Sequence, residues 1–386
     1  MPGPGYDPGV RVAIVAESFL PQVNGVTNSV LRVLEHLRAT GHEALVVAPA
    51  DDGVPTSYAD FPVQTMSALS LPVYSDVRIG LSLTSRFERI FADWGPDVVH
   101  LAAPFAMGYN AVLATSRMSI PSVAVYQTEV ASYAARYGWG RVQSLLWYRV
   151  RQIHSLATVN LAPSSYTARQ LRERSVPRVQ IWRRGVNAER FHPRHRDLGL
   201  RSKLAPGEEV LVGYMGRLAP EKQVTDLAAL ADLPGTRLVI VGDGPQRGEL
   251  ERALPGAAFL GRLGGDDLPR AVASMDVFCH PGELETFCQS IQEAEACGVP
   301  VVAPRCGGPV DLVTPGVSGY LYQPGDLGGL RASVEGLAAD PEHRQLLGRQ
   351  ARASVEHRTW AYICDQLLGH YQEAMRTIRI GDLEVV

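Results

Sequence analysis

The chain has 386 residues, of which 46% are hydrophobic and 20% are charged, and its formal net charge is −3. This balance is typical of an ordinary soluble globular protein and excludes collagen-like and intrinsically disordered chains. The length exceeds what one hydrophobic core usually serves, so we expect two domains.

Targeting signals are not evident in the sequence. No segment approaches the ~20 apolar residues of a membrane-spanning helix. Residues 1–9 are rich in Pro and Gly and lack the basic start and long apolar run of a signal peptide. Of the five cysteines, four recur every nine residues from Cys279 to Cys306 without a C-x2-C pair. This pattern favours thiols in a reducing compartment over metal ligands, so we expect a cytoplasmic protein.

The charge is unevenly distributed. Residues 117–190 contain twelve arginines, no lysine and three acidic residues, a local charge of +9. Such a field favours an anionic partner, either a phospholipid surface or a phosphorylated substrate, although scattered solvated arginines explain it equally well. Residues 141–156 form a candidate amphipathic helix, with Val142, Leu145, Leu146, Val150 and Ile153 on its apolar side. That side packs against a sheet or contacts a membrane. No recognised nucleic-acid motif accompanies the charge, so we expect no nucleic-acid partner.

In the first half, short β-branched runs alternate with helical patterns. We expect strands at residues 10–16, 44–48, 98–101, 122–126 and 158–162, and an amphipathic helix at 27–38. Strand, helix and strand at this spacing form the βαβ unit of a parallel sheet. The first half therefore reads as a doubly wound α/β domain.

A second series of strands follows the Pro-, Arg- and Gly-rich connection at 191–207. Its expected strands are 210–215, 237–241, 258–260, 277–280 and 299–303, which predicts a second Rossmann-like domain. Helix is expected from 327 to 353 and again from 360 to 375. We place the domains at 1–195 and 196–365, with 366–386 packing back on the first. Ligands bind beyond the carboxyl ends of parallel strands, so the loops there should carry the function.

The strongest motif is the segment 281–298, which lies between two expected strands. A helix beginning at Thr286 would present free backbone N–H groups to a phosphate, from Phe287, Cys288 and Gln289. Glu285 just before this helix and Glu293 two turns along it could accept hydrogen bonds from sugar hydroxyls. The alternative is an acidic helix with a solvated face.

A second motif, Gly216-Arg217 followed by Lys222, comes directly after the strand at 210–215. Arg217 can make a forked contact with phosphate oxygens, and Lys222 adds a mobile point charge. Together they could neutralise a leaving diphosphate without a metal ion. A surface ion pair between Glu221 and Lys222 is the competing interpretation.

Two loops of the first half complete the candidate site. Asn24-Gly25 allows a ligand to approach the backbone closely, or simply caps a helix. Gln127 ends a strand and offers both a donor and an acceptor to a sugar hydroxyl. Glu129 could steer an acceptor hydroxyl or pair with Arg136. His100 also ends a strand, where a structural histidine is the favoured interpretation.

With these loops in order, about 350 residues resemble glycosyltransferase family 4, retaining enzymes of the GT-B fold. The signature is the E-x7-E pair Glu285 and Glu293, supported by Arg217 with Lys222. The resemblance implies two Rossmann-like domains facing across a cleft, a diphosphate on Arg217 and Lys222, a sugar on Glu285 and a ribose on Glu293. It also implies donor contacts at further positions, which are Asn24, Gly25, Gly216, Arg262, Leu263, Phe287, Cys288 and Gln289. Members typically need no metal, so we expect neither a metal nor a cofactor.

One departure concerns Gln127-Thr128, where many members carry His-Thr. Gln127 keeps a hydrogen bond but cannot become cationic. The segments 17–26, 126–129 and 216–222 are similar to those of actinobacterial GDP-mannose-dependent α-mannosyltransferases acting on glycolipids. The resemblance thus implies a GDP-mannose donor and a lipid or glycolipid acceptor. Together with the lack of a signal peptide, the basic region leads us to expect an enzyme that is cytoplasmic or peripheral on the inner face of the plasma membrane.

For the mechanism we expect front-face substitution, because the loops supply no second acid dedicated to nucleophilic attack. Arg217, Lys222, Glu285 and Gln127 are the expected catalytic groups. Three alternatives remain. They are a UDP-sugar-dependent transferase acting on a soluble or secondary-metabolite acceptor, a sugar-nucleotide epimerase, and a non-enzymatic two-domain ligand sensor.

Overall fold

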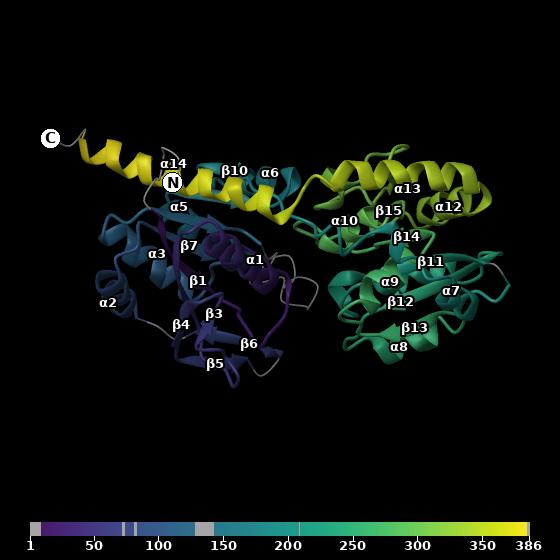
Figure 1. Ribbon diagram of the computed structural model, residues 1–386, viewed down its shortest axis with the longest axis horizontal. Coiled ribbons are helices and arrows are strands. Elements are labelled where there is room, and N and C mark those ends of the chain that lie inside the picture. The colour runs from purple at the N-terminus through teal and green to yellow at the C-terminus, as the bar shows by residue number, and fades with distance from the viewer. Residues whose placement is uncertain (1–8, 72–73, 81–82, 128–142, 208, 384–386) are drawn as a thin grey trace, which may run out of the picture. The chain divides into compact units, whose positions relative to one another are not determined.

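The computed structural model describes residues 9–71, 74–80, 83–127, 143–207 and 209–383. Glu129, Arg136 and Thr128 lie outside these ranges. The described residues pack as two compact units (Figure 1). The second unit is Gly185–Thr359, and the first contains the described residues before and after it.

The first unit is built on an eight-stranded sheet in the order β10-β9-β8-β7-β1-β2-β4-β3. Its strands are β1 (Arg11–Ala16), β2 (Glu43–Pro49), β3 (Ser57–Tyr58), β4 (Phe61–Met66), β7 (Val98–Ala102), β8 (Ser122–Val125), β9 (Val159–Ala162) and β10 (Val179–Ile181). All neighbours pair in parallel except β3 with β4. A separate hairpin joins β5 (Ala68–Leu71) to β6 (Tyr74–Gly80). The strand order reverses between β1 and β7, which makes this unit doubly wound.

Helices cover both faces of this sheet. They are α1 (Gly25–Ala39), α2 (Thr84–Trp94), α3 (Met107–Arg117), α5 (Gln143–Leu156), α6 (Ser165–Glu173) and α14 (Trp360–Leu383). The buried residues of α1 and α14 share one core, and those of α2, α3 and α5 share the other. The fold class expected for the first half is therefore confirmed.

The C-terminal helix α14, yellow in Figure 1, belongs to the first unit. Tyr371 Oη lies 2.6 Å from His100 Nδ1, and Trp182 Nε1 donates to the carbonyl of Ile363 over 2.8 Å. Burial lowers the pKa of His100 to about 3, so this ring is neutral inside the core. His100 is a structural residue that joins β7 to α14.

Helix α5 buries part of the face that was expected, because Val150 and Ile153 are buried as predicted. Trp147 and His154 are buried, whereas Leu145 is 65% exposed. His154 Nδ1 lies 2.7 Å from Asn160 Oδ1, and this hydrogen bond allows a polar ring to enter the core. The prediction was wrong for Leu145, whose place in the core is taken by Trp147 and His154.

The second unit is a six-stranded parallel sheet in the order β13-β12-β11-β14-β15-β16. Its strands are β11 (Val210–Met215), β12 (Thr236–Val241), β13 (Ala258–Gly261), β14 (Val277–Cys279), β15 (Val301–Pro304) and β16 (Gly319–Tyr322). The strand order reverses between β11 and β14. This is a second Rossmann-like domain, as the sequence predicted.

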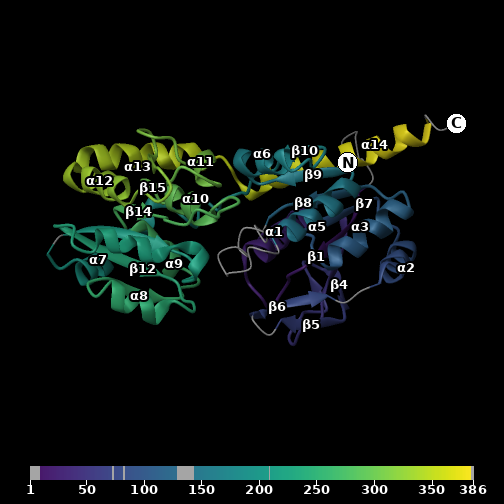
Figure 2. The same cartoon turned by 180° about the vertical axis from the view of Figure 1, so that it is seen from behind.

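Helices also cover both faces of the second sheet (Figures 1 and 2). They are η2 (Pro193–His195), α7 (Leu198–Leu204), η3 (Pro220–Lys222), η4 (Val224–Leu230), α8 (Arg247–Ala253), α9 (Asp267–Ala273), α10 (Gln289–Ala296), α11 (Pro309–Leu312), α12 (Leu327–Ala339) and α13 (Pro341–Val355). Buried residues of α7, α9 and α10 share one core, and those of η4, α8 and α12 share the other. The segment expected to be helical from 327 to 353 is helical except at Asp340, where it divides into two helices. Asp340 caps a new helix through His343 N, and Pro341 occupies its first turn.

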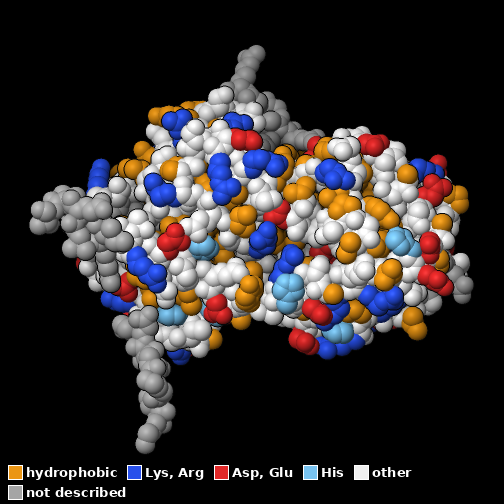
Figure 3. Space-filling view, turned by 90° about the horizontal axis from the view of Figure 1, so that it is seen from above, with side chains coloured by type: hydrophobic (Ala, Val, Ile, Leu, Met, Phe, Trp, Pro, Cys, Tyr) orange, Lys and Arg blue, Asp and Glu red, His pale blue; other side chains and the backbone are white. Residues whose placement is uncertain are grey.

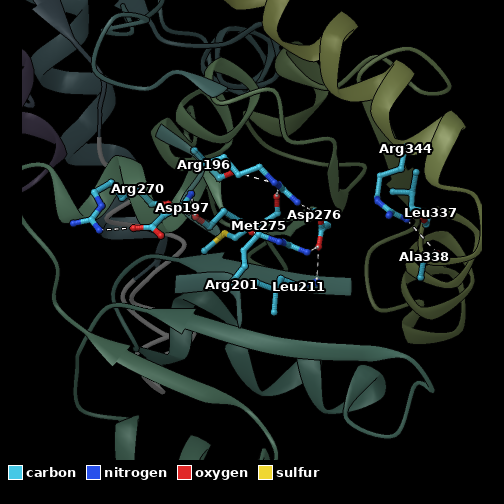
Figure 4. A network of polar contacts seen from close by, with 12 residues as sticks. Arg196, Asp197, Arg201, Leu211, Arg270, Met275, Asp276, Leu337, Ala338 and Arg344 are labelled. Carbon is cyan, nitrogen blue, oxygen red and sulfur yellow. Dashed lines mark hydrogen bonds and ion pairs between the residues drawn. The ribbon is translucent and has the colours of Figure 1, made fainter. Parts of the chain in front are cut away.

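A network of ion pairs joins α7 and α9 to the sheet of the second unit (Figure 4). The Asp276 carboxylate, 8% exposed, lies 2.6 Å from Arg196 Nη2 and 2.9 Å from Arg201 Nη2. It also accepts a hydrogen bond from the backbone of Leu211. Burial alone would raise the pKa of Asp276, but the two arginines and this hydrogen bond lower it. Asp197 pairs separately with Arg270.

Candidate active site

The loops after β11 and β14 leave the second sheet side by side. These strands are neighbours at the point where the strand order reverses, and Gly213 pairs with Phe278. In open parallel sheets this position binds ligands. Both motifs singled out in the sequence therefore meet at one edge.

Lys222 and Glu285 form an ion pair at this edge. Lys222 Nζ lies 2.5 Å from Glu285 Oε1, and their side chains are 21% and 11% exposed. Burial would raise the pKa of Glu285, but Lys222 and His280 outweigh it and lower that pKa to about 2. Lys222 is thus paired with Glu285, the residue that the family resemblance assigns to the sugar.

Arg217 is exposed at the same edge. Its backbone carbonyl accepts a hydrogen bond of 3.0 Å from Tyr214 Oη, and a Cβ at Gly216 would lie 2.6 Å from the same hydroxyl. The loop is clamped from the other side, because a Cβ at Gly242 would lie 1.9 Å from the Gly216 carbonyl. The backbone is therefore fixed, whereas the guanidinium reaches solvent.

Helix α10 begins at Gln289, three residues later than expected. Cys288 has φ 75° and ψ 73°, the left-handed conformation, and it precedes the helix. The N–H groups of the first helical turn are therefore those from Gln289 onward. Phe287 is buried in the core and Gly308 N donates to the Glu285 carbonyl over 2.7 Å, so this turn is held by the loop after β15.

Glu293 lies one turn into α10. Burial raises its pKa to about 7, despite the opposing effects of Gln289 and Arg190. Gln289 Nε2 donates to the Gly185 carbonyl over 3.1 Å. Arg262 is exposed and Leu263 half-buried after β13, with β12 between that edge strand and β11.

On the first unit, Asn24 caps helix α1. Its Oδ1 accepts hydrogen bonds from Val26 N at 2.9 Å and Thr27 N at 3.0 Å. A Cβ at Gly25 would lie 2.8 Å from Arg184 Nη1, so this glycine makes room for an arginine. The capping interpretation of Asn24 is therefore satisfied by the structure itself.

Arg184 is a candidate that sequence reasoning missed. It is buried after β10, where Nη1 donates to the Gly25 carbonyl over 3.0 Å and Nη2 donates to Gln127 Oε1 over 2.8 Å. Gln127 cannot carry a charge, but Arg184 brings a permanent one to the same amide. The pair Arg183-Arg184 could have drawn attention in the sequence. Only the contact with Gln127 in the fold, however, shows that Arg184 belongs to the candidate site.

Comparisons with known proteins identify the family. A family model described as Glycosyltransferase Family 4 matches residues 23–190, and one described as Glycosyl transferases group 1 matches residues 198–354. A GDP-mannose-dependent alpha-mannosyltransferase of Mycobacterium tuberculosis is 47% identical over 372 residues, covering 95% of this chain and 97% of that protein. The chain belongs to glycosyltransferase family 4.

Two further comparisons bear on function and fold. A GDP-mannose-dependent alpha-mannosyltransferase of Corynebacterium glutamicum is 43% identical over 371 residues, covering 95% of this chain and 89% of that protein. The sucrose-phosphate synthase structure from Thermosynechococcus elongatus has a TM-score of 0.79 at 19% identity and covers 95% of this chain and 100% of that one. The protein is a glycosyltransferase of the GT-B fold.

The second unit of this glycosyltransferase suits an anionic sugar donor. Arg217 and Lys222 supply positive charge, the first turn of α10 supplies N–H groups, and Glu285 supplies an acceptor for hydroxyls. Groups of this kind, held in place before a reaction, can stabilise charge that develops on a leaving group.

Among the described residues of this glycosyltransferase, one trio could present ligand atoms to a metal ion. His280, Glu285 and Cys288 each place one within 4.8 Å of the others. His280 was missed in the sequence, where it appeared only as the end of a strand. Lys222 already forms an ion pair with Glu285, so we interpret this trio as part of a cluster of charged side chains and not as a metal site.

Proposed function

We propose that this glycosyltransferase transfers mannose from GDP-mannose to a lipid or glycolipid acceptor with retention of anomeric configuration. The observation that carries the proposal is 43–47% identity over 95% of the chain to three enzymes named as GDP-mannose-dependent alpha-mannosyltransferases. The ion pair at the β11–β14 edge supports the reaction type. It holds the Lys222 cation beside Glu285, the carboxylate to which we assign the sugar hydroxyls.

In the proposed reaction the bond between the mannose anomeric carbon and the diphosphate oxygen breaks as the acceptor oxygen attacks the same face. The departing phosphate oxygen takes the acceptor's proton. Arg217, Lys222 and the first turn of α10 stabilise the developing charge. Glu285 binds sugar hydroxyls, Glu293 binds the ribose, and Arg262 with Leu263 lie beside the base.

The chemistry needs neither a metal nor another cofactor, because Arg217 and Lys222 provide the charge that a divalent cation would otherwise supply. On the first unit, we assign substrate contacts to Gln127, Asn24 and Gly25. Arg184 orients the amide of Gln127 by donating to its oxygen.

A thermal-shift panel of GDP, UDP and ADP tests the donor. A nucleotide that binds the folded state raises the melting temperature, so GDP should stabilise the protein at concentrations where UDP and ADP do not. Stabilisation by UDP alone would assign a UDP-sugar transferase instead. Nucleotide binding without any sugar transfer would favour the epimerase or the sensor.

The product's anomeric configuration tests the stereochemistry. Proton NMR of the product formed from GDP-mannose and a mycobacterial glycolipid extract should show an α-linked mannose. A β-linked product would exclude front-face substitution.

We also propose peripheral contact with an anionic membrane through α5. The described helices include none that is long and apolar enough to span a bilayer. Leu145, Tyr148 and Leu156 are 65%, 59% and 39% exposed on α5, and Arg151 is exposed beside them. Exposed apolar groups among arginines favour an interfacial surface. Figure 3 shows more Lys and Arg than Asp and Glu side chains on the visible face of the first unit, at its left.

Vesicle sedimentation tests this surface. Vesicles containing phosphatidylglycerol should pellet the protein at low salt and release it at high salt. Leu145→Ser with Tyr148→Ser should weaken binding, whereas Leu198→Ser, at a position 75% exposed on α7, should not. Equal binding to neutral vesicles would contradict the electrostatic part of the proposal.

A further inference from the structure

Two side chains, Lys222 and His280, hold the carboxylate of Glu285 through the same oxygen. Lys222 Nζ lies 2.5 Å from Oε1, and His280 Nε2 lies 3.0 Å from that oxygen. A carboxylate has lone pairs for about four hydrogen bonds. Among the described residues, the hydrogen bonds to this carboxylate are on Oε1, so Oε2 keeps its lone pairs for further donors, such as the hydroxyls of a sugar.

The imidazole of His280 is fixed in place. The residue follows β14 and is 2% exposed. Its ring stacks on Tyr214 of β11, with centroids 5.9 Å apart and planes 20° apart. Tyr214 also holds the Arg217 carbonyl through its hydroxyl. A Cβ at Gly282 would lie 3.0 Å from His280 Nε2 and 3.4 Å from Lys222 Cα, so the loops after β11 and β14 touch here.

The groups facing His280 are Glu285, Cys288 and Tyr214, with Lys222 across the shared oxygen. Burial lowers the pKa of His280, but Cys288 and Glu285 outweigh it and raise that pKa to about 9. This direction favours the protonated ring, which carries a positive charge beside Glu285. Glu285 thus has two positive partners and not one.

The contact of His280 with Glu285 bears on a conflict between the structure and the proposed role of Lys222. Lys222 is bound to Glu285 in the structure, yet the proposed function requires Lys222 at the donor diphosphate. Removing one partner of a buried ion pair is strongly unfavourable when the other charge is left uncompensated. A second cation on the same oxygen removes this penalty.

We propose that His280 is a positioning residue that remains on Glu285 Oε1 when Lys222 turns to the donor diphosphate. It keeps the carboxylate charged and directs Oε2 to the sugar. The proposal rests on the proposed function, because it requires a diphosphate donor. His280 touches neither donor nor acceptor and acts through Glu285.

The test compares His280→Gln with His343→Gln. A glutamine places an amide N–H near the position of Nε2 but carries no charge. His343 is a matched control on the second unit, where its Nε2 lies 2.9 Å from Tyr320 Oη. For each variant we would measure kcat, the donor and acceptor KM, GDP affinity, melting temperature and the pH profile from pH 6 to 10.

For His280→Gln we expect GDP affinity and kcat each to fall about tenfold or more, in line with the loss of one charge-assisted hydrogen bond. The acceptor KM should not change. The wild type should lose kcat/KM for the donor between pH 8 and 10, and His280→Gln should lack the part of that loss which His280 causes. His343→Gln should match the wild type in every respect.

Three outcomes would overturn the proposal. One is a lower melting temperature for His280→Gln with unchanged kinetic constants and pH profile, which would make the residue structural. Another is activity that a chelator abolishes and Zn²⁺ restores, which would make the trio with Cys288 a metal site. The third is an NMR titration of the wild type in which the His280 ring loses its proton below pH 7 with GDP bound. That titration needs no variant.

A wrong donor assignment would be visible separately. Wild-type protein would then show no turnover with GDP-mannose, and the same comparison would be made with the nucleotide sugar that it does use.

Discussion

At the scale of single residues, Lys222 carries the clearest prediction. The chain contains two lysines, Lys203 and Lys222, so each can be tested against the other. Lys222→Ala removes a charge from the proposed diphosphate site and also leaves Glu285 with one cation fewer. We expect kcat/KM for the donor to fall by about 100-fold or more, as for other groups that stabilise a leaving charge.

The control Lys203→Ala, at an exposed position of α7, should keep wild-type kinetics. Steady-state assays over a range of donor concentrations separate the effects on kcat and KM. Normal turnover of Lys222→Ala at saturating donor would refute its role in catalysis.

Arg184 carries a second prediction at this scale. Its guanidinium donates one hydrogen bond to the Gly25 carbonyl and another to the Gln127 amide oxygen. A lysine cannot make both hydrogen bonds in this geometry, because its ammonium group lacks the planar, forked arrangement of donors. Arg184→Lys should therefore lower activity, whereas Arg183→Lys, one residue earlier, should lower it much less. Equal activity of the two variants would show that the fork has no part in substrate binding. Initial rates and circular dichroism of both proteins would separate lost function from lost fold.

At the scale of elements, the cap of α1 distinguishes structure from binding. Asn24→Ala removes the acceptor for two N–H groups and should lower the free energy of unfolding by about 1 kcal/mol. Asn24→Ser should restore most of it, because serine is also a good cap. Urea unfolding measures both. A donor KM that rises in Asn24→Ala and stays high in Asn24→Ser would show an additional contact with substrate.

In helix α10, Glu293 makes the free energy of unfolding depend on pH. Its pKa is about 7 when folded, above the usual value, so the folded state binds this proton more tightly than the unfolded chain does. Stability should therefore fall as pH rises from about 4.5 to 7. In Glu293→Gln this loss disappears, and at pH 8 the variant should be more stable than wild type by about 1 to 2 kcal/mol.

Urea unfolding at pH 5 and pH 8 measures the effect, with exposed Glu335→Gln as control. If Glu293→Gln responded to pH as wild type does, burial of the carboxylate would not be what controls this stability.

Elements with a strong apolar pattern could be predicted from the sequence, and those set by one backbone conformation could not. Strand β11 was predicted at the observed bounds because Val210–Met215 is a continuous buried run. The start of α10 was misplaced because a left-handed Cys288 interrupts a sequence with good helix formers on both sides. Asp340-Pro341 was a readable cap signal that the longer helical pattern obscured.

The candidate site shows the same division. The positions of Lys222 and Glu285 after two neighbouring strands predicted that they meet, because parallel strands end at one edge. Arg184 and His280 were missed because their meaning lies in contacts with Gln127 and Glu285 that no spacing encodes.

At the scale of the whole molecule, each unit has its own sheet and its own two cores. Chains with several domains need not unfold in one step. A ligand that binds one unit should therefore raise the transition of that unit first. GDP at 100 times its Kd should add about 2.7 kcal/mol to the second unit, which contains the Lys222–Glu285 edge.

Asp276 provides the opposite change in the same unit. Asp276→Asn leaves Arg196 and Arg201 without their shared carboxylate and should destabilise the second unit by about 2 kcal/mol, a reduced value because both arginines are partly exposed.

The pKa of Asp276 is lowered on folding, so its contribution is present at neutral pH and is lost as pH falls through the folded pKa. The difference in stability between Asp276→Asn and wild type should therefore shrink as the pH falls below the usual pKa of an aspartate. Asp365→Asn, in an exposed pair with His36 on the first unit, should leave the unfolding transition of the second unit unchanged.

Scanning calorimetry with and without GDP would show the transition that Asp276→Asn lowers and the one that GDP raises. If these were different transitions, the nucleotide would not bind where the Lys222–Glu285 pair lies.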